Sequence, residues 1–168
     1  MTHARIGEIV VSRNPDEELV ALGLGSCIGV AMTDAQAQVA GLVHVMLPDS
    51  GGARGPVGKF ADTAVPELLT RVLGLGAARS RLRVAIAGGA AMFGSGGQLD
   101  IGARNAAAVR DALTAAGLRC HAEETGGTEG RTLRIQVGSG ATTVRVAGGT
   151  SFDLLPAATG ALAERRTA

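Results

Sequence analysis

The chain has 168 residues, of which 46% are apolar and 18% charged, and its formal net charge at pH 7 is only +1. A chain of this length can bury a substantial core, and we expect residues 1–168 to form one domain. The low net charge and the absence of tyrosine and tryptophan argue against nucleic-acid binding, which relies on basic patches and stacking aromatic rings.

The apolar residues are spread along the chain, and no apolar run approaches the length that crosses a membrane. The first residues lead straight into a strand-like pattern, without the apolar segment of a signal peptide. The chain has only two cysteines, so it is not built on a framework of disulfides. We therefore expect a cytoplasmic protein with reduced thiols and no membrane insertion.

Apolar, β-branched runs predict strands over much of the first third of the chain. These runs cover residues 6–11, 18–24, 27–32 and 39–47. The last two are separated by a short polar stretch and should form a β-hairpin. A four-residue loop at 34–37 would pair Thr33 with Gln38, so that paired residue numbers sum to 71. Cys27 and His44 would then be direct cross-strand neighbours, with Cβ atoms roughly 4.5–5.5 Å apart.

A loop rich in glycine and serine, residues 49–59, follows the hairpin. Loops of this kind often carry function, and this one is a candidate rim of a binding site. Apolar residues at helical spacing then predict a helix between Ala61 and Leu73. Pro66 indicates that this helix starts late or that Pro66 lies in its first turn, because proline lacks the N–H that a helix interior requires.

The second half of the chain alternates strands with one more helix. Strands are predicted at residues 82–87, 119–124, 132–137 and 142–146. The helix is predicted over Asn105–Ala116, and Gly117 should end it. The glycines of 94–97 form a second candidate rim, and we expect a partly mobile tail over 148–168. Strands joined by hairpins, with the helices as crossovers, favour an α+β domain over a doubly wound parallel sheet.

Cys27 lies within Gly23–Gly29, a segment with three glycines around the thiol and Ser26 directly before it. Glycines allow a ligand or another backbone to approach closely, so we expect room around this thiol. A cysteine beside His44 suits acyl-transfer chemistry, because the imidazole can take the thiol proton and leave a nucleophilic thiolate. The alternative is a small buried cysteine next to a core histidine in an adjacent strand.

Other candidate sites are weaker. Cys120 and His121 are adjacent on a predicted strand and would point to opposite faces, so we predict that Cys120 is a core residue and expect no metal site. The glycine spacing from Gly23 differs from G-x-G-x-x-G, and a strand-like run follows where a helix should begin, so we expect no nucleotide and no cofactor. His3 lies in a terminus that we expect to be frayed.

Several blocks of sequence resemble the chemoreceptor glutamine deamidase (CheD) family and occur in that family's order between about residues 5 and 147. They are Leu22-Gly-Leu-Gly-Ser-Cys-Ile28, Val43-His-Val-Met-Leu-Pro-Asp49, Gly58-Lys-Phe-Ala-Asp-Thr-Ala64, Ala87-Gly-Gly-Ala-Ala-Met-Phe93, Ile101-Gly-Ala-Arg-Asn105 and Ala122-Glu-Glu-Thr-Gly-Gly127. The resemblance implies β-sheets layered against two main helices, as in the toxin-type cysteine deamidases. It also implies that Cys27 is the nucleophile and His44 its base.

The family activity implied is the conversion of selected glutamines of methyl-accepting chemotaxis receptors to glutamates. Some members are also described as hydrolysing glutamyl methyl esters, and many have a CheC-type phosphatase as a partner. A cysteine peptidase or transglutaminase would share the Cys–His pair, but the further blocks argue against both. The alternative in another class is a regulatory module that binds receptors or a CheC-type phosphatase with reduced catalysis.

One position departs from the family pattern. Family members carry a threonine six residues before the nucleophile, as the third member of a Cys–His–Thr triad, and this chain has Ala21 there. Losing the group that orients an imidazole can cost orders of magnitude in rate. A backbone carbonyl, a water molecule or the hydroxyl of Ser26 or Thr125 could replace it. The backbone N–H groups near Cys27, with support from Gly25 and Ser26, are candidates for stabilising an oxyanion.

Overall fold

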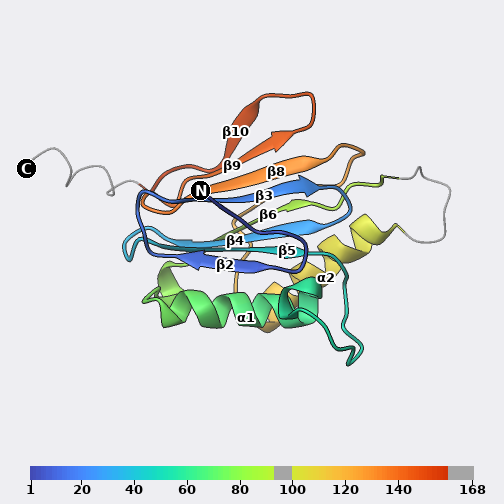
Figure 1. Cartoon of the computed structure of the whole chain (residues 1–168), viewed down its shortest axis with the longest axis horizontal. Helices are drawn as coiled ribbons and strands as arrows, with labels where there is room; N and C mark the ends of the chain where they lie inside the picture. Colours follow the sequence, from blue (N-terminus) through green and yellow to red (C-terminus); the bar gives the residue numbers. More distant parts are fainter. Residues whose placement is uncertain (93–99, 159–168) are drawn as a thin grey trace, which may run out of the picture.

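The computed structural model describes residues 1–92 and 100–158. In these residues two five-stranded sheets and two α-helices are stacked in three layers, with a sheet in the middle (Figure 1). The strands are β1 (Thr2–His3), β2 (Ile9–Ser12), β3 (Glu18–Leu24), β4 (Ile28–Asp34), β5 (Val39–Val45), β6 (Arg83–Gly88), β7 (Ala122–Thr125), β8 (Arg131–Gln136), β9 (Thr142–Val146) and β10 (Ser151–Leu155). The helices are α1 (Ala61–Gly74) and α2 (Ile101–Ala115), with 3₁₀ turns at Val57–Lys59 and Arg79–Arg81.

The central sheet has the order β2-β5-β4-β6-β7, and the outer sheet has the order β1-β3-β8-β9-β10. In the central sheet β4 is antiparallel to both β5 and β6, whereas β6 and β7 are parallel. Helix α1 connects β5 to β6, and α2 connects β6 to β7, so both helices are crossovers on the same face of this sheet (Figure 1). The α+β prediction, with mixed sheets layered against two main helices, is confirmed.

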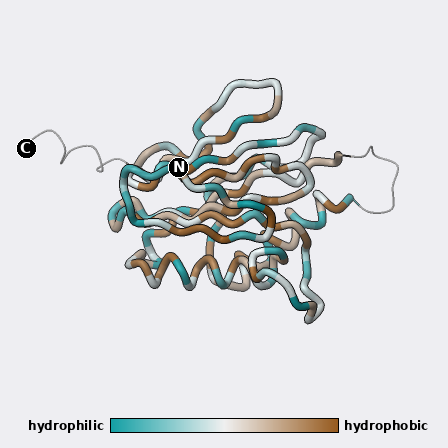
Figure 2. Tube along the Cα trace, viewed as in Figure 1, coloured by the Kyte–Doolittle hydropathy of each residue, from teal (hydrophilic) through white to brown (hydrophobic). Residues whose placement is uncertain are grey.

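Two hydrophobic cores separate the three layers, because side chains alternate between the two faces of the central sheet. In β4 the side chains of Ile28, Val30 and Met32 belong to the core against the helices, whereas Ala31 belongs to the core between the two sheets. We call these the helix-facing core and the inter-sheet core. Figure 2 shows hydrophobic stretches concentrated in the strands of the middle layer.

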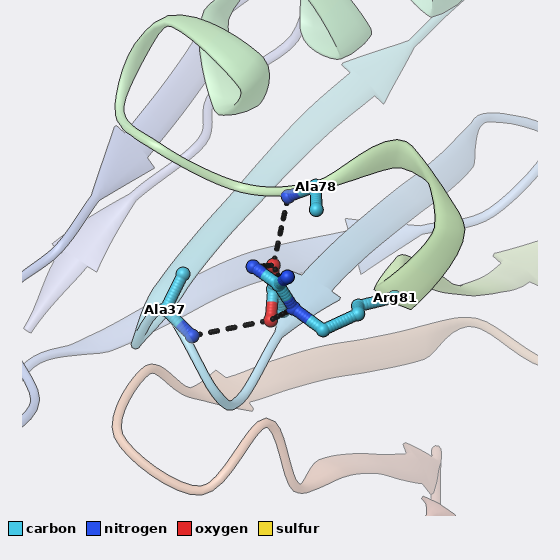
Figure 3. A network of polar contacts seen from close by, with 4 residues as sticks. Ala37, Ala78 and Arg81 are labelled. Atoms are coloured by element: carbon cyan, nitrogen blue, oxygen red, sulfur yellow. Dashed lines mark hydrogen bonds and ion pairs between the residues drawn. The ribbon is translucent and has the colours of Figure 1, made fainter.

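The predicted hairpin is present, but its predicted register is wrong. Asp34 pairs with Val39 and Gly29 with His44, so paired residue numbers sum to 73 rather than 71. Strand β4 extends to Asp34, one residue beyond the predicted last pair at Thr33, because the Asp34 side chain closes the turn. Its carboxylate is buried and accepts hydrogen bonds from the N–H groups of Ala37 and Ala78, at 3.1 and 2.8 Å, and from Arg81 (Figure 3).

Both helices differ from the predictions at their starts. Helix α1 begins at Ala61, so Pro66 lies inside it rather than in its first turn. Pro66 is exposed, and its ring is tolerated on the solvent side. Helix α2 begins at Ile101, four residues earlier than predicted, because the Asp100 side chain accepts a hydrogen bond from the N–H of Ala103 and caps the helix.

The two ends of the described chain are more regular than expected. His3, expected in a frayed terminus, lies in β1, which pairs in parallel with β3. Residues 151–155 of the expected tail form β10, which pairs with β9. The glycines of 94–97 and the last ten residues of the chain lie outside the described residues. No helix in the described ranges is long and apolar enough to span a membrane.

Candidate active site

Cys27 lies in the segment that connects β3 of the outer sheet to β4 of the central sheet. Its side chain belongs to the inter-sheet core and is only 9% exposed. Hydrogen bonds from the turn that follows β6 hold the segment. The N–H of Gly89 donates to the Cys27 carbonyl at 2.9 Å, and the N–H of Ala90 donates to the Gly25 carbonyl at 2.8 Å. A Cβ on Gly88 would lie 2.0 Å from the Cys27 oxygen, so this approach requires glycine.

The expectation of open space around the thiol is wrong, because neighbouring side chains fill the space that two of the glycines leave. A Cβ on Gly25 would lie 3.1 Å from the nearest Met92 side-chain atom. A Cβ on Gly29 would lie 2.9 Å from Leu24 and 3.0 Å from Leu133. Gly29 serves close packing of the two sheets, whereas Gly25 leaves room for Met92. Gly23, with a φ of +66°, lies in the irregularity between the Ala21 and Leu24 pairs of β3 with β8.

His44 is near the end of β5, on the face of the central sheet that meets the outer sheet. It pairs with Gly29, two residues after Cys27, so Cys27 and His44 occupy diagonal rather than directly opposite positions. In a regular ladder, diagonal neighbours are about 7–8 Å apart and within reach of long side chains. The two-residue error in register therefore leaves the thiol and the imidazole on the same face and at the same end of the sheet.

The His44 ring is buried, with 2% of the residue exposed, and only one of its nitrogens has a partner among the described residues. Nδ1 lies 3.3 Å from the carbonyl oxygen of Ala4. Because a carbonyl only accepts hydrogen bonds, this contact selects the tautomer with a proton on Nδ1. Nε2 then keeps a free lone pair and is buried without a hydrogen-bond partner. A general base needs this arrangement.

Ala4 is held beside Ala21, the position at which the resemblance to CheD proteins implies a threonine. The N–H of Ala4 donates to the Val20 carbonyl at 2.8 Å, which extends the parallel pairing of β1 with β3. One more step of this register places Ala4 next to Ala21, and both side chains belong to the inter-sheet core. The carbonyl that binds Nδ1 of His44 therefore belongs to the residue beside Ala21.

The two hydroxyl candidates lie elsewhere. The Thr125 hydroxyl accepts a hydrogen bond from Arg110 at 3.2 Å. Ser26 is connected through its carbonyl, which accepts a hydrogen bond from the side chain of Asn105 at 2.9 Å. Among the described residues, neither hydroxyl forms a hydrogen bond with the His44 ring. Sequence reasoning did not identify Ala4, because a backbone carbonyl has no signature in the sequence.

Burial keeps both candidate catalytic groups neutral. It raises the pKa of the Cys27 thiol above its ordinary value. It also lowers the pKa of His44, and the hydrogen bond to Ala4 opposes this lowering only in part. The resting pair is therefore a thiol and an imidazole, and proton transfer between them needs further stabilisation of the thiolate.

The second cysteine and its neighbour have other surroundings. Cys120 packs against the helix-facing core and donates a hydrogen bond to the Ala122 carbonyl at 3.3 Å. His121 accepts a hydrogen bond from the N–H of Val84 at 3.0 Å, so its imidazole binds the backbone of β6 just before the pairing of β6 with β7 begins. In the part of the chain that the structure describes, no three Cys, His, Asp or Glu side chains gather in a way that could hold a metal ion.

Two hollows on the surface lie near these elements. One, of about 620 Å³, lies between α1 and α2 and is lined by residues such as Pro66, Arg104 and Ala112. The other, of about 330 Å³, is lined by Gly89, Ala106 and Thr125 among others. Gly89 connects the smaller hollow to the Cys27 segment, since its N–H donates to the Cys27 carbonyl.

Comparison with known proteins agrees with the sequence blocks. A family model described as CheD chemotactic sensory transduction matches residues 46–146. A probable chemoreceptor glutamine deamidase CheD of Symbiobacterium thermophilum is 47% identical over 149 residues, which cover 85% of this chain and 90% of that protein. The chain belongs to the CheD family. The chemoreceptor glutamine deamidase CheD of Thermotoga maritima is also 47% identical, over 144 residues that cover 86% of this chain and 90% of that protein.

The CheD family model begins two residues after His44, so its match covers neither Cys27 nor His44. It does cover Asn105, which lies in one of the blocks that resemble CheD proteins. Asn105 was given no role from the sequence, although it is completely buried and its side chain contacts the Cys27 segment.

Proposed function

We propose that this CheD-family chain deamidates glutamine side chains of chemotaxis receptors, with Cys27 as nucleophile and His44 as general base. The names of its relatives support the substrate class. The observation that carries the chemistry is the state of His44. Its Nδ1 is bound to the Ala4 carbonyl, and its Nε2 is buried and unpaired on the face that also holds Cys27.

The reaction proceeds in two halves. Nε2 of His44 takes the thiol proton, and the thiolate of Cys27 attacks the carboxamide carbon of the substrate glutamine. The protonated imidazole then gives its proton to the departing nitrogen, ammonia leaves, and a thioester remains. His44 next removes a proton from water, whose oxygen attacks the thioester carbon. The C–S bond breaks, the sulfur regains a proton, and the product is glutamate.

Charge develops on the carbonyl oxygen of the substrate in both halves, and backbone N–H groups of the Cys27 segment would stabilise it. No hydrogen bond of the described loops and turns uses the N–H of Ser26 or Cys27 as donor. The same machinery hydrolyses a glutamyl methyl ester, because only the leaving group differs. That activity and a CheC-type partner are parts of the proposal that the family resemblance alone supports.

The test compares the wild type with Cys27→Ala on a receptor signalling domain. Ammonia release and the conversion of glutamine to glutamate are measured together, the second by peptide mass spectrometry. Cys27→Ala and His44→Ala should each lose at least about 1,000-fold in rate, as removal of a member of a catalytic set does. Cys120→Ala is the matched control and should keep the rate. Equal conversion by the wild type and Cys27→Ala would refute the proposal.

The regulatory-module alternative is favoured by Ala21 and by the covered thiol. It predicts binding of receptors without turnover, and Ala21→Thr should then raise the rate greatly. We expect instead a change of less than about threefold, because the Ala4 carbonyl already holds Nδ1 of His44, and a lower stability from burying a hydroxyl. The same substitution at Ala64, which is fully buried in the helix-facing core, separates the effect on stability from the effect on rate.

A further inference from the structure

Asn105 is a completely buried polar residue on α2, the helix that otherwise packs small aliphatic side chains against the central sheet. Its side-chain amide donates to two backbone carbonyls, that of Ser26 at 2.9 Å and that of Met46 at 2.8 Å. Ser26 directly precedes Cys27, and Met46 follows His44 by two residues. One side chain therefore binds the segments that carry both candidate catalytic groups.

The pairing of β4 with β5 does not reach these segments. Its last pair is Ile28 with Val45. Beyond that pair the two backbones turn to different partners, since the Cys27 carbonyl accepts from Gly89 and the N–H of Met46 donates to the Lys59 carbonyl at 2.9 Å. The Asn105 amide spans the gap that the missing ladder bonds leave.

The orientation of the amide is determined by its partners. Both partners are carbonyl oxygens, which only accept, so the NH₂ group must point at them. The other end of the amide, Oδ1, is buried without a hydrogen-bond partner among the described residues. Burying an unpaired acceptor is costly, but the same amide keeps two backbone carbonyls paired, and a leucine of similar size would leave both without this donor. The amide is therefore oriented by the two backbone segments that it joins.

We propose that Asn105 is a positioning residue that fixes the separation of Cys27 from His44 by binding the Ser26 and Met46 carbonyls with one amide group. The inference rests on the proposed function, because it assigns Asn105 a role in the same site. Asn105 itself touches neither reacting group in the described contacts. It acts through the backbone on both sides, and a small displacement of either group would weaken proton transfer from the thiol to Nε2.

The test uses Asn105→Leu, which removes both donors at similar volume, and Asn105→Ser, a smaller residue that keeps one donor. Val109→Ala is the matched control, one turn further along α2 and fully buried in the helix-facing core. For Asn105→Leu we expect kcat for receptor deamidation to fall about 10- to 100-fold with little change in KM, because misplacement of catalytic groups affects the chemical step. Val109→Ala should lose stability and keep kcat.

A second measurement does not depend on receptor turnover. The rate of alkylation of Cys27 by iodoacetamide is followed against pH by peptide mass spectrometry, with Cys120 in the same molecule as reference. In both Asn105 variants the pH midpoint for Cys27 should shift by about half a unit or more, because the surroundings of the thiol and its separation from His44 change, while Cys120 keeps its profile. If wild type deamidates no receptor, the proposed function fails, and alkylation still decides the role of Asn105.

An unchanged Cys27 profile in a folded variant would overturn the inference, and so would a loss of stability with wild-type kcat. Thermal unfolding followed by circular dichroism establishes which variants are folded. If Asn105→Leu does not fold, Asn105→Ser decides by the same two measurements. A kcat loss in Val109→Ala equal to that in the Asn105 variants would also overturn it, because the effect would then belong to the helix and not to the amide.

Discussion

At the scale of single residues, burial and one hydrogen bond determine what His44 can do. Water would satisfy both ring nitrogens at an exposed position, but here one is bound to Ala4 and the other has no partner among the described residues. Burial also disfavours the charged forms of both His44 and Cys27. The resting site therefore favours a neutral thiol over a thiolate, so the proposed mechanism requires that the backbone stabilise the oxyanion as the proton is transferred.

The pH dependence of the reaction follows from the lowered pKa of His44. In the proposed mechanism the neutral form of His44 is the base, and a lowered pKa keeps this form present to a lower pH than in an ordinary histidine. We expect kcat/KM to fall on the acid side with a midpoint below 6.5, the ordinary histidine value. The measurement is a pH–rate profile of receptor deamidation.

The control for this profile is His121→Gln, which removes the other histidine whose pKa burial lowers. His121 serves the backbone of β6, so its replacement should leave the midpoint where it is in the wild type. A wild-type midpoint above 6.5, or one that moves in His121→Gln, would contradict the assignment of His44 as the base.

At the scale of elements, β1 has a larger role than its two residues indicate. It brings the Ala4 carbonyl to His44 and holds it there through the bond from Ala4 to the Val20 carbonyl. The resemblance to CheD proteins implies a side-chain hydroxyl at position 21, whereas in this chain the main-chain oxygen that binds His44 belongs to Ala4, the neighbour of Ala21. A main-chain acceptor depends on how its strand is docked, and not on the identity of the side chain.

Ala4→Pro tests the role of β1. Proline removes the N–H that binds Val20, so the strand should detach at this point and release Nδ1 of His44. We expect kcat to fall about 10-fold or more, because the imidazole loses the group that orients it. Rates are compared with those of Arg5→Ala, a substitution of the exposed next residue that should be neutral. Wild-type kcat in folded Ala4→Pro would show that β1 does not orient His44.

The hairpin shows how far the sequence alone predicts these elements. The apolar runs and the polar turn predict the pairing of β4 with β5, but the register depends on which turn residue ends the strand. Asp34 looks like a loop residue in the sequence, yet partners 3 to 47 positions away make it the last residue of β4. The start of α2 and the docking of β1 also depend on side-chain caps or distant carbonyls, so local patterns do not predict them.

The Asp34 network ties the β4–β5 turn to the connection between α1 and β6 (Figure 3). Asp34→Ala should lower the free energy of unfolding by about 2–4 kcal/mol, because it leaves the N–H groups of Ala37 and Ala78 unpaired. Arg81→Ala should cost less than about 1 kcal/mol, since the Arg81 side chain is 39% exposed and the ion pair is screened by water. Urea unfolding measures both.

The same network should make stability depend on pH. Burial raises the pKa of Asp34, but hydrogen bonds from Arg81, Ala78 and Ala37 outweigh this, and the pKa is lowered overall. A carboxyl group with a lowered folded pKa contributes stability that is complete above its unfolded value, 3.8, and is lost as the pH falls through the folded value. The wild type should therefore lose more stability than Asp34→Ala between pH 5 and pH 2. Equal losses would contradict the network.

At the scale of the whole molecule, the two cores have different relations to the site. The helix-facing core supports the central sheet from the side away from Cys27. The inter-sheet core contains the Cys27 side chain, and His44 lies on the same face of the central sheet. The spacing of the two sheets is set where Gly29 meets Leu24 and Leu133, and Leu133 also pairs with Ala21. Disturbing this core should therefore affect catalysis as well as stability.

Leu133→Ala and Leu68→Ala test this difference, because both leucines are completely buried, one in each core. Each truncation should lower the free energy of unfolding by about 2–5 kcal/mol through the cavity it leaves. At a temperature where both variants are folded, kcat should fall about 10-fold or more in Leu133→Ala and stay within about twofold of wild type in Leu68→Ala, because only the first lets the outer sheet shift against Gly29 and His44. Equal effects on kcat would mean that the spacing of the two sheets does not position the site.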